Sequence, residues 1–392
     1  MFEEEKRGQR SSPPKKQDLE MRRAEKEDFG IIHVQIGRCG NELGCKFLDQ
    51  IASEDAVFQE GEEALAGLEH SCYFTSGYIK STPRALIIDS EQETMDEVRS
   101  SSIGQHYTQE NFIFSNHPTK SNWAKGHYSQ SNLLLPHIQD ALRKEAEKLN
   151  HFEFQIFHSM AGGTGGGLSA NVLSLIQDQY PGNCVQCFSV FPSTKVSDSV
   201  FEPYNAALSL SSVIQYAQIC HVFDNEALYE INFRTLGKGI PNYADLNKIA
   251  CKSMIGISMP YRRLEVMQPV RGMVEQFGNP ANSRMHFLVN GYKEKAEDVA
   301  EDYDYDFILC DCDETQEAYK KLEASIAKDR YYMRNSRIII DMLKRIDSQF
   351  TAAFRLKAYL YKYTGEGMEE MDFVEAQADM NDLIAEYNTY HE

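Results

Sequence analysis

The feature that most constrains the fold is a glycine-rich run between two segments of opposite character, Gly162-Gly163-Thr164-Gly165-Gly166-Gly167. The residues before it, Phe152 to Phe157, form an apolar run of the length of a buried strand, and those from Leu168 to Tyr180 have helical spacing. Glycines let the backbone approach an anion closely, and the start of the following helix adds positive potential. The run therefore predicts a phosphate-binding turn in an α/β protein.

The same order of elements recurs along the chain. Ile31 to Ile36 is expected to form a buried strand that leads into the turn Gly37-Arg38-Cys39-Gly40 and a helix from Asn41. Alternation of strands and helices predicts a doubly wound, mostly parallel sheet. Further strands are expected over 84–89, 111–114, 185–191 and 217–223, helices over 131–149 and 243–255, irregular chain over 259–334, and two long closing helices over 336–363 and 368–387.

The two glycine turns are expected to converge on one phosphate chain, because both join a strand to a helix N-terminus. Asp89 and Glu91 follow the strand over 84–89, where α/β sheets place ligands, so they are candidates to hold Mg²⁺ through water. The alternatives stay open at this point: a turn packed close to a sheet for the glycines, and a solvated acidic turn for the carboxylates.

Common nucleotide motifs do not fit the glycine run. A Walker A loop needs Lys-Ser/Thr after its last glycine, and G-x-G-x-x-G counted from Gly163 meets Leu168 at its last position. An NAD-type oxidoreductase also needs an acidic residue about 20 positions downstream, and 185–192 contains none. That class of enzyme is therefore disfavoured.

The net charge and the cysteine content limit the expected partners and the expected compartment of the chain. The 40 basic and 59 acidic residues give a formal charge of -19, which disfavours nucleic acid and anionic membrane surfaces. The charged segment 1–29 is expected to form a disordered or helical arm without a secretory pattern, so an intracellular protein is expected. Nine scattered cysteines, with Cys184 and Cys187 in a C-x-x-C and Cys310 and Cys312 in a C-x-C, are interpreted as reduced thiols without a metal site.

Several long stretches, in order, resemble the tubulin family, and they are closest to its beta type. The opening stretch His33-Val34-Gln35-Ile36-Gly37-Arg38-Cys39-Gly40-Asn41 is similar to the family's H-I-Q-A-G-Q-C-G-N. The resemblance covers 30–258 and 334–392. The other similar stretches are Thr94 to Arg99, Asn122 to Tyr128, Lys195 to Asp198, Glu202 to Asn205, Asp224 to Tyr229, Phe233 to Leu236, Tyr363 to Met368 and Met380 to Leu383.

The resemblance implies a GTP-binding domain over 30–240, a core helix with a truncated intermediate domain over 241–334, and C-terminal helices over 335–392 that form the outer face of a filament. It also implies GTP or GDP with Mg²⁺ as cofactors. The implied partners are alpha/beta tubulin or another tubulin-family subunit and microtubule-associated proteins, with no nucleic acid and no membrane. The implied location is the cytoplasm and the cytoskeleton, with the cilium or basal body as specialised cases.

The resemblance also assigns roles to residues. Asn225, Tyr243 and Asn247 match the family's guanine contacts, with the tyrosine stacked on the base, and Asp198 and Glu202 match the segment around the ribose. Glu91, with Asp89 as a second candidate, is expected to serve Mg²⁺. The full set of expected GTP-binding residues is Gly37, Arg38, Cys39, Ser159, Gly162, Gly163, Thr164, Gly165, Gly166, Asp198, Glu202, Asn225, Tyr243 and Asn247.

Four departures from the family's pattern shape the expected function. Pro118-Thr119-Lys120-Ser121 replaces G-A-G-N, and Arg38 and Glu42 replace two glutamines. No G-x-x-N-x-D is recognisable in 261–269, where the family supplies the acid that completes hydrolysis, and the segment 291–334 is short. The chain is therefore expected to be a divergent tubulin that joins or caps filaments with weak or absent GTP hydrolysis. The alternative is a tubulin-like pseudo-GTPase that binds no nucleotide and acts as a scaffold or regulator.

Overall fold

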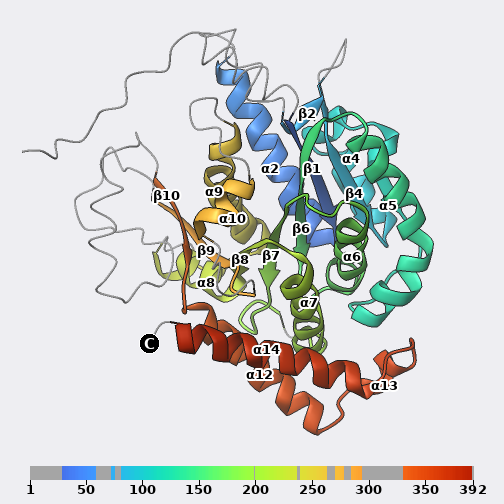
Figure 1. Ribbon diagram of the computed structural model, residues 1–392, viewed down its shortest axis with the longest axis vertical. Coiled ribbons are helices and arrows are strands. Elements are labelled where there is room, and N and C mark those ends of the chain that lie inside the picture. Colours follow the sequence, from blue (N-terminus) through green and yellow to red (C-terminus); the bar gives the residue numbers. More distant parts are fainter. Residues whose placement is uncertain are drawn as a thin grey trace, which may run out of the picture.

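The computed structural model describes residues 29–58, 72–75, 81–197, 199–235, 239–262, 270–277, 284–293 and 330–390 (Figure 1). Five sequence-based expectations lie wholly or mostly outside the described residues. They concern the arm before Phe29, the ribose contact assigned to Asp198, the stretch 261–269, the segment 291–334, and the C-x-C of Cys310 and Cys312.

An eight-stranded sheet forms the centre of the protein, in the order β10-β9-β8-β7-β6-β1-β4-β5 (Figure 1). Every neighbouring pair is parallel except β9 and β10, which pair antiparallel. The mostly parallel sheet predicted from the sequence is therefore confirmed. Its strands are β1 (Phe29–Ile36), β4 (Ala85–Asp89), β5 (Phe112–Phe114), β6 (His151–Ser159), β7 (Val185–Phe191), β8 (Ile219–Asp224), β9 (Phe287–Lys293) and β10 (Arg330–Asn335), and a separate ribbon pairs β2 (Phe74–Thr75) with β3 (Thr82–Pro83).

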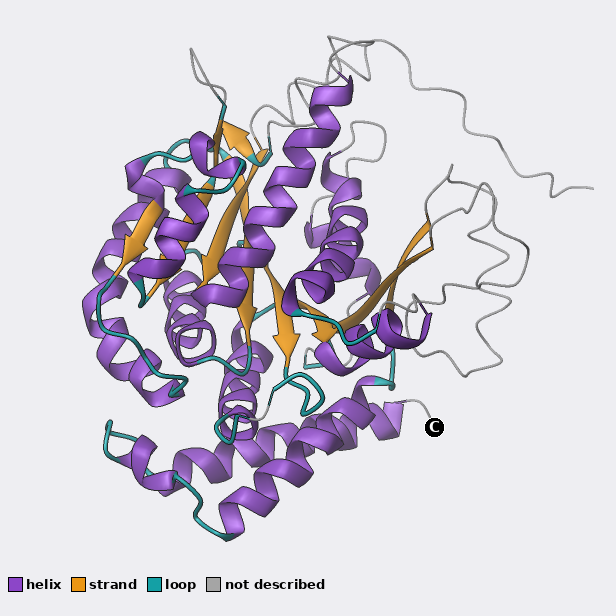
Figure 2. Ribbon diagram, turned by 180° about the vertical axis from the view of Figure 1, so that it is seen from behind, coloured by secondary structure: helices purple, strands orange, loops and turns teal. Residues whose placement is uncertain are grey.

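Helices cover both faces of this sheet (Figures 1 and 2). They are α2 (Gly37–Phe58), α4 (Gln92–Arg99), α5 (Ser131–Ala146), α6 (Ser169–Gln179), α7 (Glu202–Tyr216), α8 (Asn225–Glu230), α9 (Tyr243–Arg262), α10 (Val270–Phe277), α12 (Ile339–Arg355), α13 (Leu360–Thr364) and α14 (Glu370–Tyr390). Short 3-10 segments lie at Ile103–His106 and Gln109–Asn111, and π-helical segments at Lys125–Gln130, Gly163–Leu168 and Ile231–Thr235.

The two faces bury separate apolar clusters, as the period of two along a strand requires. In β1, Ile32 and Val34 pack with α5, α6 and α7, whereas Ile31 packs on the opposite side with α2 and α9. The C-terminal helices α12 and α14 extend the first cluster by packing against α7, along the bottom of Figure 1. The sheet thus connects the outer C-terminal helices on one face to the core helix α9 on the other.

Polar side chains cross the buried sheet in a continuous chain. His33 bonds Gln155 at 3.2 Å, Gln155 donates to Gln186 at 2.8 Å, Gln186 bonds His221 at 2.6 Å, and His221 bonds Asn290 at 2.7 Å. Burial lowers the pKa of His33 to about 3 and of His221 to about 4, so both imidazoles are neutral. Because a slip in register would leave buried polar groups unpaired, this chain helps to fix the order of β1, β6, β7, β8 and β9.

The structure corrects three expectations. The helix after β1 begins at Gly37 instead of Asn41, so the first glycine turn is itself the opening turn of α2. The stretch 259–334 is not irregular throughout, because α9 runs to Arg262, α10 follows, and β9 and β10 add to the same sheet. The first closing helix is broken between α12 and α13, where Lys357 and Tyr359 have φ of 49° and 57°, a left-handed conformation that ends a helix.

Tyr204 of α7 is the aromatic centre of the contact with the C-terminal helices. Its ring is fully buried and meets Phe350, Tyr363 and Phe373 edge-on at centroid distances of 5.3, 5.6 and 5.3 Å. Burial raises the pKa of its hydroxyl, which has no hydrogen-bond partner among the described residues. Tyr204 thus supplies packing, while its hydroxyl carries a desolvation cost.

We expect Tyr204→Ala to lower the free energy of unfolding by about 3–5 kcal/mol, because it leaves a cavity between α7 and the C-terminal helices. Tyr204→Phe keeps the ring and removes the unpaired hydroxyl, so it should leave the protein as stable or about 1 kcal/mol more stable. Urea unfolding of the two variants measures both effects. A loss of several kcal/mol in the phenylalanine variant would show that the hydroxyl has a partner.

Candidate nucleotide-binding site

The candidate site lies where the parallel strands end. β1, β4, β6 and β8 end at Ile36, Asp89, Ser159 and Asp224, and each is followed directly by residues that the sequence singled out. The carboxyl ends of parallel strands share one edge of the sheet, which is the usual ligand position in such folds. The topology thus gathers segments that are far apart in the sequence.

The two glycine turns lie against each other. Gly37 has a φ of 76°, and a Cβ added to it would meet the amide nitrogen of Gly165 at 2.9 Å. A Cβ on Gly40 would lie 2.2 Å from the carbonyl oxygen of Phe157 in β6. Side chains at these positions would force the loops apart. The expected convergence of the two turns is therefore present in the structure.

Three buried hydroxyls connect the glycine run to the neighbouring loops. The Thr164 hydroxyl lies 2.7 Å from that of Ser90 after β4 and 3.2 Å from that of Thr119. The next residues, Lys120 and Ser121, have φ of 52° and 56° in the left-handed region. The sequence identified 118–121 as a departure from the family's pattern, and within this loop Lys120 and Ser121 carry the unusual backbone.

His158 supports the glycine run from behind, within the core. Its Nδ1 lies 2.9 Å from the Gly165 carbonyl oxygen and its Nε2 lies 2.8 Å from the Ser189 hydroxyl of β7. Burial lowers the pKa of this imidazole to about 4. A ring nitrogen donates to the Gly165 carbonyl, so this bond holds the middle of the loop in place.

The candidate magnesium residues lie at the end of β4. Asp89 is buried and accepts a hydrogen bond of 2.7 Å from the Ser90 amide, and Glu91 is partly exposed before α4. Burial raises the pKa of Asp89 to about 6, although hydrogen bonds from Thr94 and the Ser90 amide oppose the shift. A hard cation would favour the charged carboxylate. Two carboxylates fit Mg²⁺, which takes its remaining ligands from water and phosphate oxygens.

The residues assigned to the base gather at the start of α9. Tyr243, its first residue, is 53 % exposed, and Asn247 follows one turn later, buried, with its Nδ2 3.0 Å from Glu42 Oε2 of α2. Burial raises the pKa of the Tyr243 hydroxyl, as do the nearby Glu202, Cys39 and Glu42, while a hydrogen bond with Ser197 lowers it. An exposed ring beside polar groups from three segments is suited to hold a base and its sugar.

Three further residues assigned to the nucleotide, Arg38, Cys39 and Ser159, lie in or next to the two glycine turns. Arg38 is exposed at the start of α2 and pairs with Glu97 at 2.7 Å and Glu42 at 3.3 Å. Burial raises the pKa of Cys39 to about 12, with a further contribution from Glu42, which favours the protonated thiol. The Ser159 hydroxyl accepts a hydrogen bond of 3.2 Å from the Ala161 amide at the entry of the glycine run.

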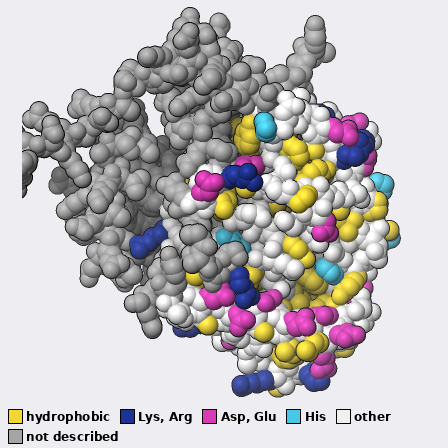
Figure 3. Space-filling view, in the orientation of Figure 1, with side chains coloured by type: hydrophobic (Ala, Val, Ile, Leu, Met, Phe, Trp, Pro, Cys, Tyr) yellow, Lys and Arg dark blue, Asp and Glu magenta, His cyan; other side chains and the backbone are white. Residues whose placement is uncertain are grey.

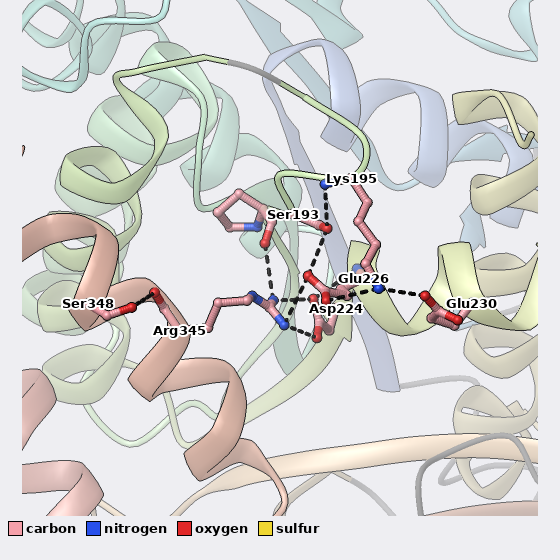
Figure 4. Close-up of polar contacts among 8 residues, drawn as sticks. Ser193, Lys195, Asp224, Glu226, Glu230, Arg345 and Ser348 are labelled. Carbon is pink, nitrogen blue, oxygen red and sulfur yellow. Dashed lines mark hydrogen bonds and ion pairs between the residues drawn. The ribbon is translucent and has the colours of Figure 1, made fainter. Parts of the chain in front are cut away.

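A polar cluster connects α12 to Asn225, assigned to the base, and to the loop before Glu202, assigned to the ribose; these two are called the base segment and the ribose segment (Figure 4). Arg345 of α12 donates to Asp224 Oδ1 at 2.7 Å and to the Pro192 carbonyl at 3.3 Å. Glu226 accepts from the Ser193 hydroxyl at 3.1 Å and pairs with Lys195 at 3.2 Å. Burial raises the pKa of Asp224, and Arg345 opposes that shift. Asn225 and the loop that leads to Glu202 are therefore held by one arginine.

Sequence reasoning missed Arg345, Ser90 and Thr119. Arg345 could have been suspected, because it is a cation next to Ile346 within the apolar periodicity of α12. Ser90 and Thr119 carry no comparable signal, since their contacts with Thr164 depend on how three loops meet. Asn225, at the start of α8, lies in the same segment as this cluster, but among the described residues no hydrogen bond joins its side chain to Tyr243 or Asn247.

The fold is that of a nucleotide-binding α/β domain, and its two glycine turns are in contact at the edge where such domains bind their ligands. A comparison with protein-family models matches residues 30–233 to the Tubulin/FtsZ family, GTPase domain. This match covers more than half of the chain, and the chain belongs to the Tubulin/FtsZ family. In the described part of the chain, no helix has both the length and the apolar character that a membrane span requires.

We expect Gly37→Ala to destabilise the protein by about 2 kcal/mol, because the left-handed φ costs about 1–2 kcal/mol and the new Cβ meets the Gly165 backbone. Gly162→Ala is the matched control. Gly162 has a φ of -83° and its Cβ would meet nothing closer than 3.6 Å, so the change in stability should stay within about 1 kcal/mol. Denaturant midpoints test the pair, and equal losses would contradict the close contact between the turns.

Proposed function

We propose that this protein is a divergent, beta-like tubulin that binds GTP or GDP with Mg²⁺ and acts as a structural subunit of the microtubule cytoskeleton. The observation that carries the proposal is the close contact of two glycine turns beside Tyr243 and Asn247. The N-terminal amides of α2 and of the π-helical turn Gly163–Leu168 form a cradle that suits the phosphates, and the tyrosine ring suits the base.

The proposed site divides among the described segments. Gly37, Thr164 and Gly165 hold the phosphates. Asn225 and Asn247 contact guanine, and Glu202 lies beside the ribose. Asp198, outside the described residues, is proposed for the ribose from the resemblance alone. Glu91, with Asp89 behind it, positions the water around Mg²⁺. The bound cation neutralises phosphate charge, and the chain's own residues hold the nucleotide in one orientation.

Purified protein should release about one equivalent of guanine nucleotide per chain when it is denatured in the presence of a chelator. The cradle would keep the nucleotide through purification, as expected for a ligand bound by many backbone amides. Chromatography of the released material identifies and counts the nucleotide. Protein that neither carries nucleotide nor takes up added GTP would instead support the pseudo-GTPase scaffold, for which the altered Pro118–Ser121 loop is the argument.

The proposed place in a filament follows from the two ends of the molecule. The nucleotide-bearing end keeps the loops described above, whereas 261–269 has no recognisable G-x-x-N-x-D and the segment 291–334 is much shorter than in the family that the sequence resembles. A head-to-tail polymer needs two complementary ends on every subunit. We therefore infer weak or absent hydrolysis, and joining or capping of filaments made by alpha/beta tubulin or another tubulin-family subunit.

The C-terminal helices offer the proposed surface for microtubule-associated proteins. Acidic and apolar side chains lie together on this part of the face in Figure 3. On α14, Met371 and Val374 are 59 % and 45 % exposed beside Glu370 and Glu375. A mixed surface of this kind suits partners with basic and apolar side chains. The proposed location is the cytoplasm and its microtubules, including those of the cilium or basal body.

Electron microscopy of the chain with GTP, alone and mixed with alpha/beta tubulin, tests its place in a filament. We expect no tubes from the protein alone, because one of the two longitudinal ends lacks the family's pattern. In the mixture we expect sparse incorporation or decoration of filament ends. Long tubes formed by this chain alone would contradict the proposal. A variant with Gly37→Ala, which alters the proposed nucleotide site, serves as the control.

A further inference from the structure

Four side chains form a continuous polar chain along the candidate site. Asn247 of α9 donates from Nδ2 to Glu42 Oε2 at 3.0 Å, and Glu42 Oε1 accepts from Arg38 Nε at 3.3 Å. Arg38 also donates from its terminal nitrogen to Glu97 of α4 at 2.7 Å. Side chains of three separate helices, α2, α4 and α9, are therefore linked, and within this chain Glu42 alone contacts the asparagine amide.

The chemistry of Glu42 leaves only one orientation for that amide. An ionised carboxylate accepts hydrogen bonds and cannot donate them, so it must face the NH₂ group of Asn247. The carbonyl oxygen Oδ1 then points away from Glu42, and among the described residues it has no hydrogen-bond partner. A glutamine in place of Glu42 can donate or accept, so it would allow the Asn247 amide to turn over.

Tyr243 and Asn247 are four residues apart on α9 and share one face of the helix. With the exposed Tyr243 ring as the stacking surface, Asn247 Oδ1 is an acceptor at the edge of the stacked base. Guanine presents donors there, its N1–H and its 2-amino group, whereas adenine lacks the 2-amino group and xanthine carries a carbonyl oxygen in its place. An acceptor fixed at this edge therefore distinguishes guanine from both.

We propose that Glu42 is a specificity-determining positioning residue, which selects guanine by holding the carbonyl oxygen of Asn247 toward the base. The inference rests on the proposed nucleotide-binding function and deepens it. Arg38 has a matching role: its guanidinium bonds the second oxygen of Glu42 and offsets the negative charge that the carboxylate brings near the phosphates. Glu97 holds the other side of Arg38 and makes no contact with Asn247.

The test compares Glu42→Gln with Glu97→Gln in the full chain. Both substitutions remove one negative charge beside Arg38, but only the first releases the Asn247 amide. Equilibrium dissociation constants are measured for GTP, XTP and ATP after removal of bound nucleotide. We expect Glu42→Gln to bind XTP more tightly and to reduce the preference for GTP over XTP about tenfold, because the turned amide can donate to the xanthine oxygen.

The possible outcomes distinguish failure of the role proposed for Glu42 from failure of the proposed nucleotide binding. Glu97→Gln should keep the GTP preference within twofold, even where its affinities for all three nucleotides shift together. An unchanged preference in Glu42→Gln, or equal changes in both variants, would overturn the role of Glu42 while leaving nucleotide binding intact. If Glu42 had only a structural role, Glu42→Gln would lower the affinities for GTP and XTP equally, and that result would also overturn the inference. If the unaltered chain binds none of the three, the proposed function fails and the inference with it.

Discussion

The contact between two backbones at the ends of β1 and β6 is the constraint on which the site depends. A Cβ at Gly40 would lie 2.2 Å from the Phe157 carbonyl oxygen, and one at Gly37 would meet the Gly165 amide nitrogen at 2.9 Å. Strand pairing already aligns Ile36 with His158, so the turns after both strands start side by side. Only glycine allows them to stay there, because every other side chain would fill the space that the backbone occupies. The position of the later loops follows, since Thr164 in this contact bonds Ser90 and Thr119.

A second set of contacts connects this edge to the outer face of the protein. Arg345 reaches from α12 to Asp224 and to the carbonyl oxygen of Pro192, which precede the base segment and the ribose segment (Figure 4). Both pair members are largely buried, at 24 % and 15 % side-chain exposure, so loss of the arginine would leave a buried carboxylate without its cation. The same α12 packs with α7 and α14. The surface proposed for partners and the proposed nucleotide site are thus connected through α12.

The sequence was sufficient for features that depend on local pattern. The strand over 185–191 has the bounds that were predicted, and the doubly wound sheet follows from strands that alternate with helices. Features that depend on contacts between distant segments could not be predicted from the sequence. β9 and β10 lie in a stretch whose composition looks irregular, and they become strands because the β8 edge offers them a ladder to pair with. The break after Arg355 depends on left-handed residues that have no glycine to mark them, and the bond between Glu42 and Asn247 joins positions 205 apart.

The Arg38–Glu42 pair is better explained by a ligand than by stability. Both side chains are substantially exposed, at 55 % and 36 %, and exposed pairs four residues apart on a helix contribute only about 0.3–0.5 kcal/mol. Their position matters more than that energy, because one lies at the phosphate end of the cradle and the other bonds the asparagine assigned to the base. Without Arg38, the Glu42 carboxylate would lose the cation that it pairs with, and without Glu42, Arg38 would keep Glu97 as its partner. Arg38 thus offsets the charge of Glu42, and in the proposed role Glu42 holds an amide that could otherwise turn over, with its oxygen as the acceptor.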